Sequence, residues 1–511
     1  MKEKQVMELR TLGALKKAGY ISRPVKDELR ANLIKVMREG KDPFQGIHGF
    51  EHTVIPDLER AILSRHNIIL LGLRGQAKTR IARLLTQLMD EYIPIVAGSE
   101  LNDDPFAPLS RYAKDKIAEL GDDTPVEWLH RDARYTEKLA TPDVSIADLI
   151  GDVDPIKAAN LKLPYNDERV IHFGLIPRAH RGIFVINELP DLQARIQVAL
   201  FNILQEGDIQ IRGFNIRLPL NIQFVFTANP EDYTNRGAIV TPLKDRIESQ
   251  ILTHYPKDLE TAKHITHQEA DLHPDQKERV QYNNIIQDLI EQIAFEARAS
   301  EYVDQKSGVS ARMTISAFEN IVSAAERRVL KNGEDNAYIR IGDLWGVIPA
   351  ITGKVELVYE GEQEGPYIVA VNLIGKAIRA QFGNYFPLPE KKTKLQAKKN
   401  GNTENASMGL YRDIIDWFNE GNTLDLMNNA SEKEYRDGLD SVPGLRMIVR
   451  KYNKGLDAET EHFMMEFLLY GLAEYSLLSK NMLVAGISFK DLFTSVFNEE
   501  DLFEEDPDDE I

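Results

Sequence analysis

The sequence predicts an α/β protein with a parallel-sheet core, followed by a helical region and an additional C-terminal helical module. Three observations support this prediction. Between residues 43 and 256, short β-rich apolar runs alternate with amphipathic stretches, as in strands joined by crossover helices. The stretch GLRGQAKTR at 72–80 follows the first clear run directly, as a loop does between a strand and a helix. After residue 256, apolar side chains recur at helical spacing, for example at Ile285, Leu289 and Ile293.

Length and local composition divide the chain further. A chain of 511 residues is too long for one compact core, so we expect several domains. The clearest predicted strands are the apolar runs 67–71, 183–186 and 224–227. The expected divisions are a helical N-terminal leader (1–42), the α/β domain (43–256), a helical lid with a mixed extension (257–386), a polar lysine-rich linker (387–407), a separate helical module (408–497) and an acidic tail (498–511).

The bulk composition excludes several classes of function. The chain has 62 basic and 80 acidic side chains, and this balance of −18 argues against broad, sequence-independent binding to nucleic acid or to an anionic membrane. It contains no cysteine, which rules out disulfides and thiolate metal sites and fits a reducing compartment. The first twenty residues lack the apolar segment of a secretory signal. The most apolar stretch, 463–489, is interrupted by charges and predicts a buried helix pair, so we expect a cytoplasmic protein.

The loop at 72–80 has the residue types of a phosphate-binding loop. Glycines let successive N–H groups converge on one anion, a lysine reaches the β- and γ-phosphates, and the next hydroxyl ligates Mg²⁺. Lys78 and Thr79 hold the last two positions, and an amphipathic helix follows at once. The alternative is a tight turn in a sheet protein. The residues predicted to bind nucleotide are Gly72, Leu73, Arg74, Gly75, Gln76, Ala77, Lys78 and Thr79, with Thr79 also a metal ligand.

Ala77 departs from this pattern, because a glycine usually precedes the lysine. Alanine enters the left-handed backbone geometry of that position at a cost of about 1 kcal/mol. This cost is small beside several charge-assisted hydrogen bonds to a nucleotide, so we expect binding to survive.

A second motif follows the apolar run 183–186, where Asn187 and Glu188 end a predicted buried strand. Parallel sheets present metal and water ligands at this end of their strands. We expect Glu188 to polarise the attacking water. Asn187 stands where an aspartate normally supports the Mg²⁺ shell, and its amide keeps an oxygen acceptor but lacks the charge. We therefore expect weaker metal affinity or slower turnover.

Three further polar residues complete the predicted catalytic set. Asn229 ends the apolar run 224–227 and can orient the water between Glu188 and the γ-phosphate. Arg246 follows a short predicted helix and is suited to reach the nucleotide of a neighbouring subunit, where an arginine stabilises the charge of phosphoryl transfer. Arg312, near the start of a lid helix, is predicted to touch the γ-phosphate. A surface ion pair is the alternative for each arginine taken alone.

The longer segments around these motifs carry a family resemblance. They include DPFQGIHGFEHTVIPDLERAIL, before the first strand, and GLIPRAHRGIFVINELPDLQARIQVALFNILQEGDIQIRG, around Asn187 and Glu188. Together with the motifs, they resemble an AAA+ P-loop NTPase of the magnesium chelatase I-subunit/MoxR group over about residues 43–328. By position, the resemblance implies Walker A ligands at Lys78 and Thr79, Walker B at Asn187 and Glu188, sensor 1 at Asn229, the arginine finger at Arg246 and sensor 2 at Arg312.

The resemblance also implies an activity and partners. It implies an ATPase that uses ATP and Mg²⁺, works as a homo-hexameric ring and remodels a partner protein, for metal insertion or complex maturation. Such partners often carry a von Willebrand A domain, and we find no Asp-x-Ser-x-Ser motif for one in this chain. The segment 207–221 resembles a hairpin insert that lines the pore or docks a partner; a plain surface hairpin is the alternative.

Other functions remain open from the sequence. Ala77 and Asn187 favour slow hydrolysis, or a nucleotide-dependent scaffold that binds ATP and barely hydrolyses it. A true magnesium chelatase subunit is a narrower reading, which the added C-terminal region disfavours. A σ54-type activator ranks lower, because we find no GAFTGA-like loop. His264 and His267 are spaced as two metal ligands on a helix, but no third ligand is evident, so we expect a surface role.

Overall fold

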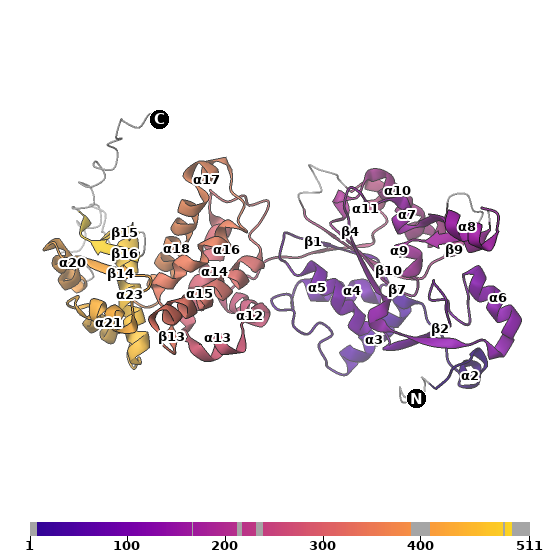
Figure 1. The fold of residues 1–511 in the computed structure, drawn as a ribbon, viewed down its shortest axis with the longest axis horizontal. Coiled ribbons are helices and arrows are strands. Elements are labelled where there is room, and N and C mark those ends of the chain that lie inside the picture. Colours follow the sequence, from indigo (N-terminus) through magenta and orange to yellow (C-terminus); the bar gives the residue numbers. More distant parts are fainter. Residues whose placement is uncertain are drawn as a thin grey trace, which may run out of the picture. The chain divides into compact units, whose positions relative to one another are not determined.

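The structure is a computed structural model, and it describes residues 8–165, 167–211, 217–230, 239–389, 409–483 and 486–492. The chain divides into two compact units, residues 1–255 and 256–511, which are described separately below (Figure 1). The predicted acidic tail, most of the predicted linker and the hairpin turn near Gly213 lie outside the described residues. Among the described helices, none combines the length and the apolar character needed to span a membrane.

The first unit is built on a five-stranded parallel sheet in the order β11-β1-β10-β7-β4. The predicted strands at 67–71, 183–186 and 224–227 are confirmed as β1, β7 and β10. Strand β1 is an interior strand, between β10 and β11, and the loop that follows it lies at the carboxyl edge, where such sheets bind ligands. The strand bounds are β1 Ile68–Leu71, β4 Tyr135–Leu139, β7 Gly182–Asn187, β10 Ile222–Ala228 and β11 Ser249–Leu252.

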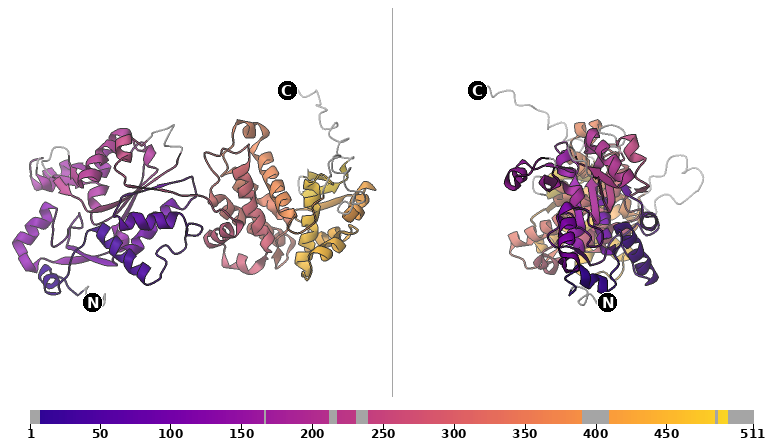
Figure 2. Two further views of the ribbon diagram at one scale, coloured as in Figure 1. Left: turned by 180° about the vertical axis from the view of Figure 1, so that it is seen from behind. Right: turned by 90° about the vertical axis from the view of Figure 1, so that its right-hand side faces the viewer.

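Helices cover both faces of this sheet, because the central strands are apolar on both sides. On one face, Val185 and Val225 pack with α3, α4 and α5; on the other, Phe184 and Phe226 pack with α9, α10 and α11. The two views of Figures 1 and 2 show these helix groups on opposite sides of the strands. The helix bounds are α2 Leu12–Lys17, α3 Val25–Arg38, α4 Val54–Leu63, α5 Lys78–Leu84, α9 Leu175–Arg178, α10 Ala194–Glu206 and α11 Thr241–Lys244.

The predicted N-terminal leader is part of the first unit. Helix α3 buries Val25, Leu29 and Leu33 in the same core as α4 and α5. Its Glu28 forms a buried salt bridge with Arg134, 2.6 Å between Oε2 and Nη2. Removing one member of such a pair would leave an uncompensated buried charge, so this contact fixes α3 against the sheet.

Short insertions surround the sheet. The predicted hairpin after α10 has antiparallel arms β8 and β9, and its Ile209 and Ile211 are buried in the core beside α10. Two other antiparallel pairs, β2 with β3 and β5 with β6, accompany α6, α7 and α8. Their bounds are β2 Tyr92–Val96, α6 Arg111–Leu120, β3 Val126–His130, α7 Ile146–Leu149, β5 Gly151–Val153, α8 Pro155–Leu161, β6 Ile171–Phe173, β8 Asp208–Gln210 and β9 Arg217–Pro219.

The second unit is mainly helical and has one hydrophobic core. Its central helices α14, α15 and α18 carry buried apolar residues at helical spacing, as the sequence predicts. The bounds are α12 Leu259–Glu269, α13 Pro274–Arg279, β12 Val280–Gln281, α14 Asn284–Ala299, α15 Ala311–Asn332, β13 Ala337–Tyr338, α16 Ile348–Thr352, α17 Tyr359–Glu364, α18 Pro366–Phe382, α20 Arg412–Asn419, β14 Leu424–Met427, α21 Glu432–Asp440, α22 Leu445–Tyr452, α23 Ala458–Glu474, β15 Ser479–Leu483 and β16 Gly486–Lys490.

Two expectations for the C-terminal region need correction. The region after residue 408 does not have a core of its own, since Phe467 of α23 packs against Phe382 and Phe386 from the stretch before the predicted linker. The predicted helix pair at 463–489 is one helix followed by the β15–β16 hairpin, which pairs with β14. A continuous apolar run does not distinguish a second buried helix from buried strands, which explains this error.

Candidate nucleotide-binding site

The predicted loop connects β1 to α5 with the backbone geometry that a phosphate-binding loop requires. Gly75 and Ala77 both have left-handed backbones, with φ of 73° and 55°, and α5 begins at Lys78. Ala77 therefore takes the conformation of the glycine that it replaces. The loop N–H groups lie at the start of α5, where the helix dipole favours an anion.

Side chains that follow β11 hold the loop in place. The Thr253 hydroxyl contacts Gln76 Oε1 at 2.7 Å, and the Tyr255 hydroxyl donates to the Arg74 carbonyl at 2.8 Å. The buried Gln76 side chain therefore shapes the loop, and the predicted contact of Gln76 with nucleotide stays a prediction. A side chain at Gly72 would overlap both Thr253 and Gln76, so only glycine fits there. The loop is preorganised by its neighbouring strand.

Lys78, Asn229 and Glu188 meet at the carboxyl edge of the sheet. The buried Lys78 ammonium donates to Asn229 Oδ1 at 2.9 Å and to the carbonyls of Gly72 and Leu73. Asn229 Nδ2 in turn donates to Glu188 Oε2 at 3.1 Å. These contacts join the ends of β1, β10 and β7, three segments far apart in the sequence, into one polar chain.

Glu188 also has a left-handed backbone conformation, with φ of 54°. For a side chain other than glycine this costs about 1 kcal/mol or more, and such strain gathers at functional sites. The Glu188 N–H donates to Thr227 Oγ1 at 3.1 Å, which ties the strained residue to strand β10.

Asn187, the predicted metal-shell residue, has both ends of its amide engaged. Its Oδ1 accepts from the Thr227 hydroxyl at 3.1 Å, and its Nδ2 donates to Glu137 Oε1 at 2.5 Å. Thr227 thus orients Asn187 and Glu188 together with one hydroxyl. Glu137 comes from β4, the neighbouring strand, where it lies opposite Val185.

Glu137 also faces the helix that begins at the loop. Arg83 of α5 donates to Glu137 Oε2 from Nε at 3.1 Å and from Nη2 at 3.0 Å, and Tyr135 OH donates to the same oxygen at 3.0 Å. The hydrogen bond to Glu137 raises the pKa of Arg83. Burial, followed by the Glu137 charge, raises the pKa of Tyr135. Arg83 lies one helical turn after Thr79, so both side chains project from the same face of α5.

Arg246 lies just after α11, as predicted, and its guanidinium is held against α10. It donates to Gln205 Oε1 from Nε and Nη2 at 3.0 and 2.7 Å and to the Pro242 carbonyl at 2.6 Å. It also lies 5.3 Å from the ring centre of Phe201. These contacts are with its own subunit, and its action on a neighbouring subunit stays a prediction.

Arg312 belongs to the second unit, where it is exposed in the first turn of α15, next to the N-cap Ser310. Its contact with nucleotide stays a prediction. His264 and His267 both lie on α12, and no cluster of three or more potential metal ligands of the His, Asp or Glu type occurs in the described part of the chain.

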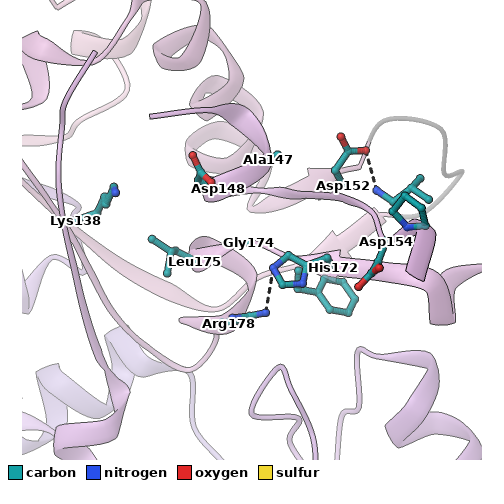
Figure 3. A pocket seen from close by; sticks show the side chains of 12 residues that line it. Lys138, Ala147, Asp148, Asp152, Asp154, His172, Gly174, Leu175 and Arg178 are labelled. Atoms are coloured by element: carbon teal, nitrogen blue, oxygen red, sulfur yellow. Dashed lines mark hydrogen bonds between the residues drawn. The ribbon is translucent and has the colours of Figure 1, made fainter. Parts of the chain in front are cut away.

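A separate hollow of about 490 Å³ lies among the insertions (Figure 3). Acidic and basic side chains line it together, and His172 contacts Arg178 in it at 3.5 Å. Lys138 projects into this hollow, whereas Glu137, the residue before it in β4, contacts α5 on the other face of the sheet. The hollow is therefore distinct from the loop site. The other lining residues are Ala147, Asp148, Asp152, Val153, Asp154, Pro155, Phe173, Gly174 and Leu175.

Sequence reasoning missed three residues of the site: Glu137, Thr227 and Thr253. Thr227 carries a signal, because it is a polar residue inside the otherwise apolar run FVFTAN. Glu137 and Thr253 carry none, since their roles depend on which strands become neighbours.

The residues present fit a Mg²⁺–nucleotide complex. The left-handed loop supplies N–H groups for phosphates, the buried Lys78 supplies a cation, and Thr79 and Asn187 would provide oxygen ligands or water contacts for Mg²⁺. When bound, Mg²⁺ would neutralise charge on the phosphates.

Comparisons with known proteins find partial matches to this chain. The model of the sigma-54 interaction domain matches residues 165–250, which include Asn187, Glu188 and Asn229. The magnesium-chelatase 38 kDa subunit of Cereibacter sphaeroides is 26% identical over 197 residues, covering 38% of this chain and 53% of that subunit. The same subunit of Rhodobacter capsulatus is 25% identical over 223 residues, covering 43% and 58%. The chain thus spans little more than half the length of these relatives.

One solved structure is similar at lower identity. A cryo-EM-based structure of the complex between the magnesium chelatase subunits BchI and BchD contains a chain with 20% identity and a TM-score of 0.33. The match covers 63% of this chain and 98% of that one.

The parallel sheet, the loop at its first strand and the polar strand ends are features of an α/β P-loop fold of the AAA+ type. Over part of its length, the chain is similar in sequence to the magnesium-chelatase 38 kDa subunit.

Proposed function

We propose that this protein binds ATP with Mg²⁺ at the loop site and hydrolyses it to change the conformation of a partner protein. The observation that carries the proposal is the hydrogen-bonded chain from Lys78 through Asn229 to Glu188. It joins a phosphate-binding cation to a carboxylate that can activate water, with a neutral amide between them. This is the arrangement that hydrolysis of a terminal phosphate needs.

Each residue has a distinct task in this proposal. Lys78 neutralises the β- and γ-phosphates, while the loop N–H groups hold them. Asn229 orients the water and Glu188 accepts its proton as the oxygen attacks the γ-phosphate, whose bond to the leaving ADP oxygen breaks. Arg246 of a neighbouring subunit would stabilise the transition-state charge, so the active unit is a ring, and we infer a hexamer. Arg312 would sense the γ-phosphate from the lid.

The partner is inferred from the relatives alone. The BchI chain occurs in a complex with BchD, which supports a protein partner for this chain as well. We propose that the partner carries a von Willebrand A domain and that remodelling serves metal insertion or complex maturation.

A nucleotide-dependent scaffold is the second candidate, favoured by the contacts of Asn187. Its amide carries no charge, and Thr227 and Glu137 already engage both of its ends. Such a protein would bind Mg²⁺–ATP tightly and turn it over near background.

Two substitutions separate binding from turnover. We expect Lys78→Ala to weaken Mg²⁺–ATP binding about 100-fold, because it removes charge-assisted hydrogen bonds to the phosphates. We expect Glu188→Gln to keep the affinity within about threefold and to lower the hydrolysis rate at least 100-fold, because it removes only the base. Calorimetry measures binding, and phosphate release measures turnover.

The exposed Arg195→Ala on α10 is the matched control and should change neither quantity. Binding that is unaffected by Lys78→Ala would contradict the nucleotide site itself. The scaffold would be favoured over the motor if the wild-type protein bound Mg²⁺–ATP tightly but hydrolysed it only at the background rate, and if Glu188→Gln left this rate unchanged.

A further inference from the structure

The partly exposed carboxylate that contacts Asn187 is not explained by the motifs. At the end of β7, residue 187 is an amide, although a carboxylate would better support a divalent cation. Yet a carboxylate is present: Glu137 Oε1 lies 2.5 Å from Asn187 Nδ2. The negative charge that a carboxylate at position 187 of β7 would supply is therefore found on the neighbouring strand, β4.

The contacts of Glu137 place its carboxylate on the side of the sheet where α5 carries Thr79, the predicted Mg²⁺ ligand. Glu137 and Asn187 lie on the face of the sheet that α5 covers, since Arg83 of α5 contacts Glu137. Arg83 and Thr79 share one face of α5. Glu137 therefore borders the strip of α5 that carries the predicted Mg²⁺ ligand.

The hydrogen bond also fixes which atom Asn187 offers. Because Nδ2 donates to Glu137, Oδ1 turns toward Thr227 and keeps a second lone pair. Donation from Nδ2 to a carboxylate polarises the amide and makes Oδ1 a stronger acceptor. Glu137 thus acts on the metal shell in two ways, through its charge and through the amide that it orients.

We propose that Glu137 is a positioning residue that supplies, through Asn187, the negative charge of the Mg²⁺ shell. This inference rests on the proposed function and deepens it. The pair Asn187–Glu137 takes the place of a single carboxylate at the end of β7. The Arg83 ion pair orients Glu137 but competes for its charge.

The test measures the free Mg²⁺ concentration that half-saturates binding of a fluorescent, non-hydrolysable ATP analogue to the full-length protein. We expect Glu137→Gln to raise this concentration about tenfold, as for other residues that support metal ligands. Binding of the same analogue in EDTA should be unchanged or tighter, because removing a negative charge does not weaken binding of an anion. If Glu137→Gln weakened analogue binding both in Mg²⁺ and in EDTA, the cause would be a structural defect, and the proposal would be overturned.

Two further variants make the test specific. In the double variant Asn187→Asp/Glu137→Gln, the pair again holds one carboxylate and one amide, and we expect its Mg²⁺ requirement to return to within about threefold of wild type. Asn187→Asp alone places two carboxylates in contact, so it should lower the thermal unfolding midpoint in EDTA. A double variant no better than Glu137→Gln would overturn the proposal.

Arg83→Gln is the matched control for the ion pair. If Glu137 served only to bind Arg83, Glu137→Gln and Arg83→Gln would raise the Mg²⁺ requirement by the same factor. We expect Arg83→Gln to leave it unchanged or lower it. Failure of the proposed function would give a different result. In that case the wild-type protein would not bind the ATP analogue in a Mg²⁺-dependent way, or Lys78→Ala would not abolish this binding.

Discussion

Ala77 and Glu188 are the two residues of the site with left-handed backbones and side chains beyond hydrogen. Ala77 precedes the helix that carries Lys78, and Glu188 follows strand β7 and carries the carboxylate that we propose as the base. Each conformation costs about 1 kcal/mol or more, and the surrounding contacts maintain it. Glu188 is held by Thr227, and the Ala77 loop is held from β11 through Thr253. The strain therefore lies at the two places where we propose that the phosphate and the attacking water bind.

Substitution at Ala77 tests this strain. Ala77→Gly relieves it but gains freedom in the unfolded chain, so we expect the free energy of unfolding to change by less than about 1 kcal/mol. Ala77→Val places a β-branched side chain at φ of 55°, and we expect a loss of about 2 kcal/mol with weaker ATP binding. Urea denaturation measures both variants. Equal stability of the two would show that the left-handed backbone is not maintained in solution.

At the scale of elements, α23 shows how packing overrides local preference. Its buried residues run without interruption from Glu461 to Leu472, so the helix is covered on all sides. It contains Gly471, a poor helix former, at the point where Phe382 of α18 lies against its backbone. The glycine is needed because a larger side chain would overlap the Phe382 ring.

Gly471→Ala sets the two effects against each other. Helix propensity favours alanine by about 1 kcal/mol, whereas overpacking against the buried Phe382 costs about 1–3 kcal/mol. We expect net destabilisation of the second unit in thermal or urea unfolding. Gly438→Ala in α21 is the control, because its added methyl would meet Leu424 at an ordinary 3.4 Å and should stabilise. A stabilising Gly471→Ala would contradict the close approach of α18 and α23.

At the scale of the whole molecule, the two units have separate hydrophobic cores, and the nucleotide loop, Glu188 and Arg246 all belong to the first. Gln205 and the Pro242 carbonyl hold Arg246 on its own subunit. An arginine that is held in this way at the surface is better placed to contact the nucleotide of a neighbouring copy than the nucleotide of its own subunit. On the proposed mechanism, the site is complete only in an assembly of several copies.

Mixing two inactive variants tests the shared site. Arg246→Ala should lower turnover about 1000-fold with little change in ATP affinity, because it removes a contact made only in the transition state. In a mixture with Lys78→Ala, some interfaces combine an intact loop with an intact arginine, and we expect activity to reappear. Phosphate release against mixing ratio measures this. A mixture as inactive as its components, with assembly confirmed by light scattering, would argue against action in trans.

Sequence patterns alone predicted strands β1, β7 and β10 and the loop before α5, and the structure confirms these elements. The roles of Lys78, Asn229 and Glu188, drawn from the same patterns, stay proposals. These features are local: apolar runs, a glycine-containing turn and polar residues at strand ends each depend on neighbours in the chain. The contacts of Asn187 with Glu137, of Gln76 with Thr253 and of α23 with α18 were decided only by the tertiary structure. They join segments from about 50 to 180 residues apart, and no local pattern specifies which strand or helix becomes the neighbour of another.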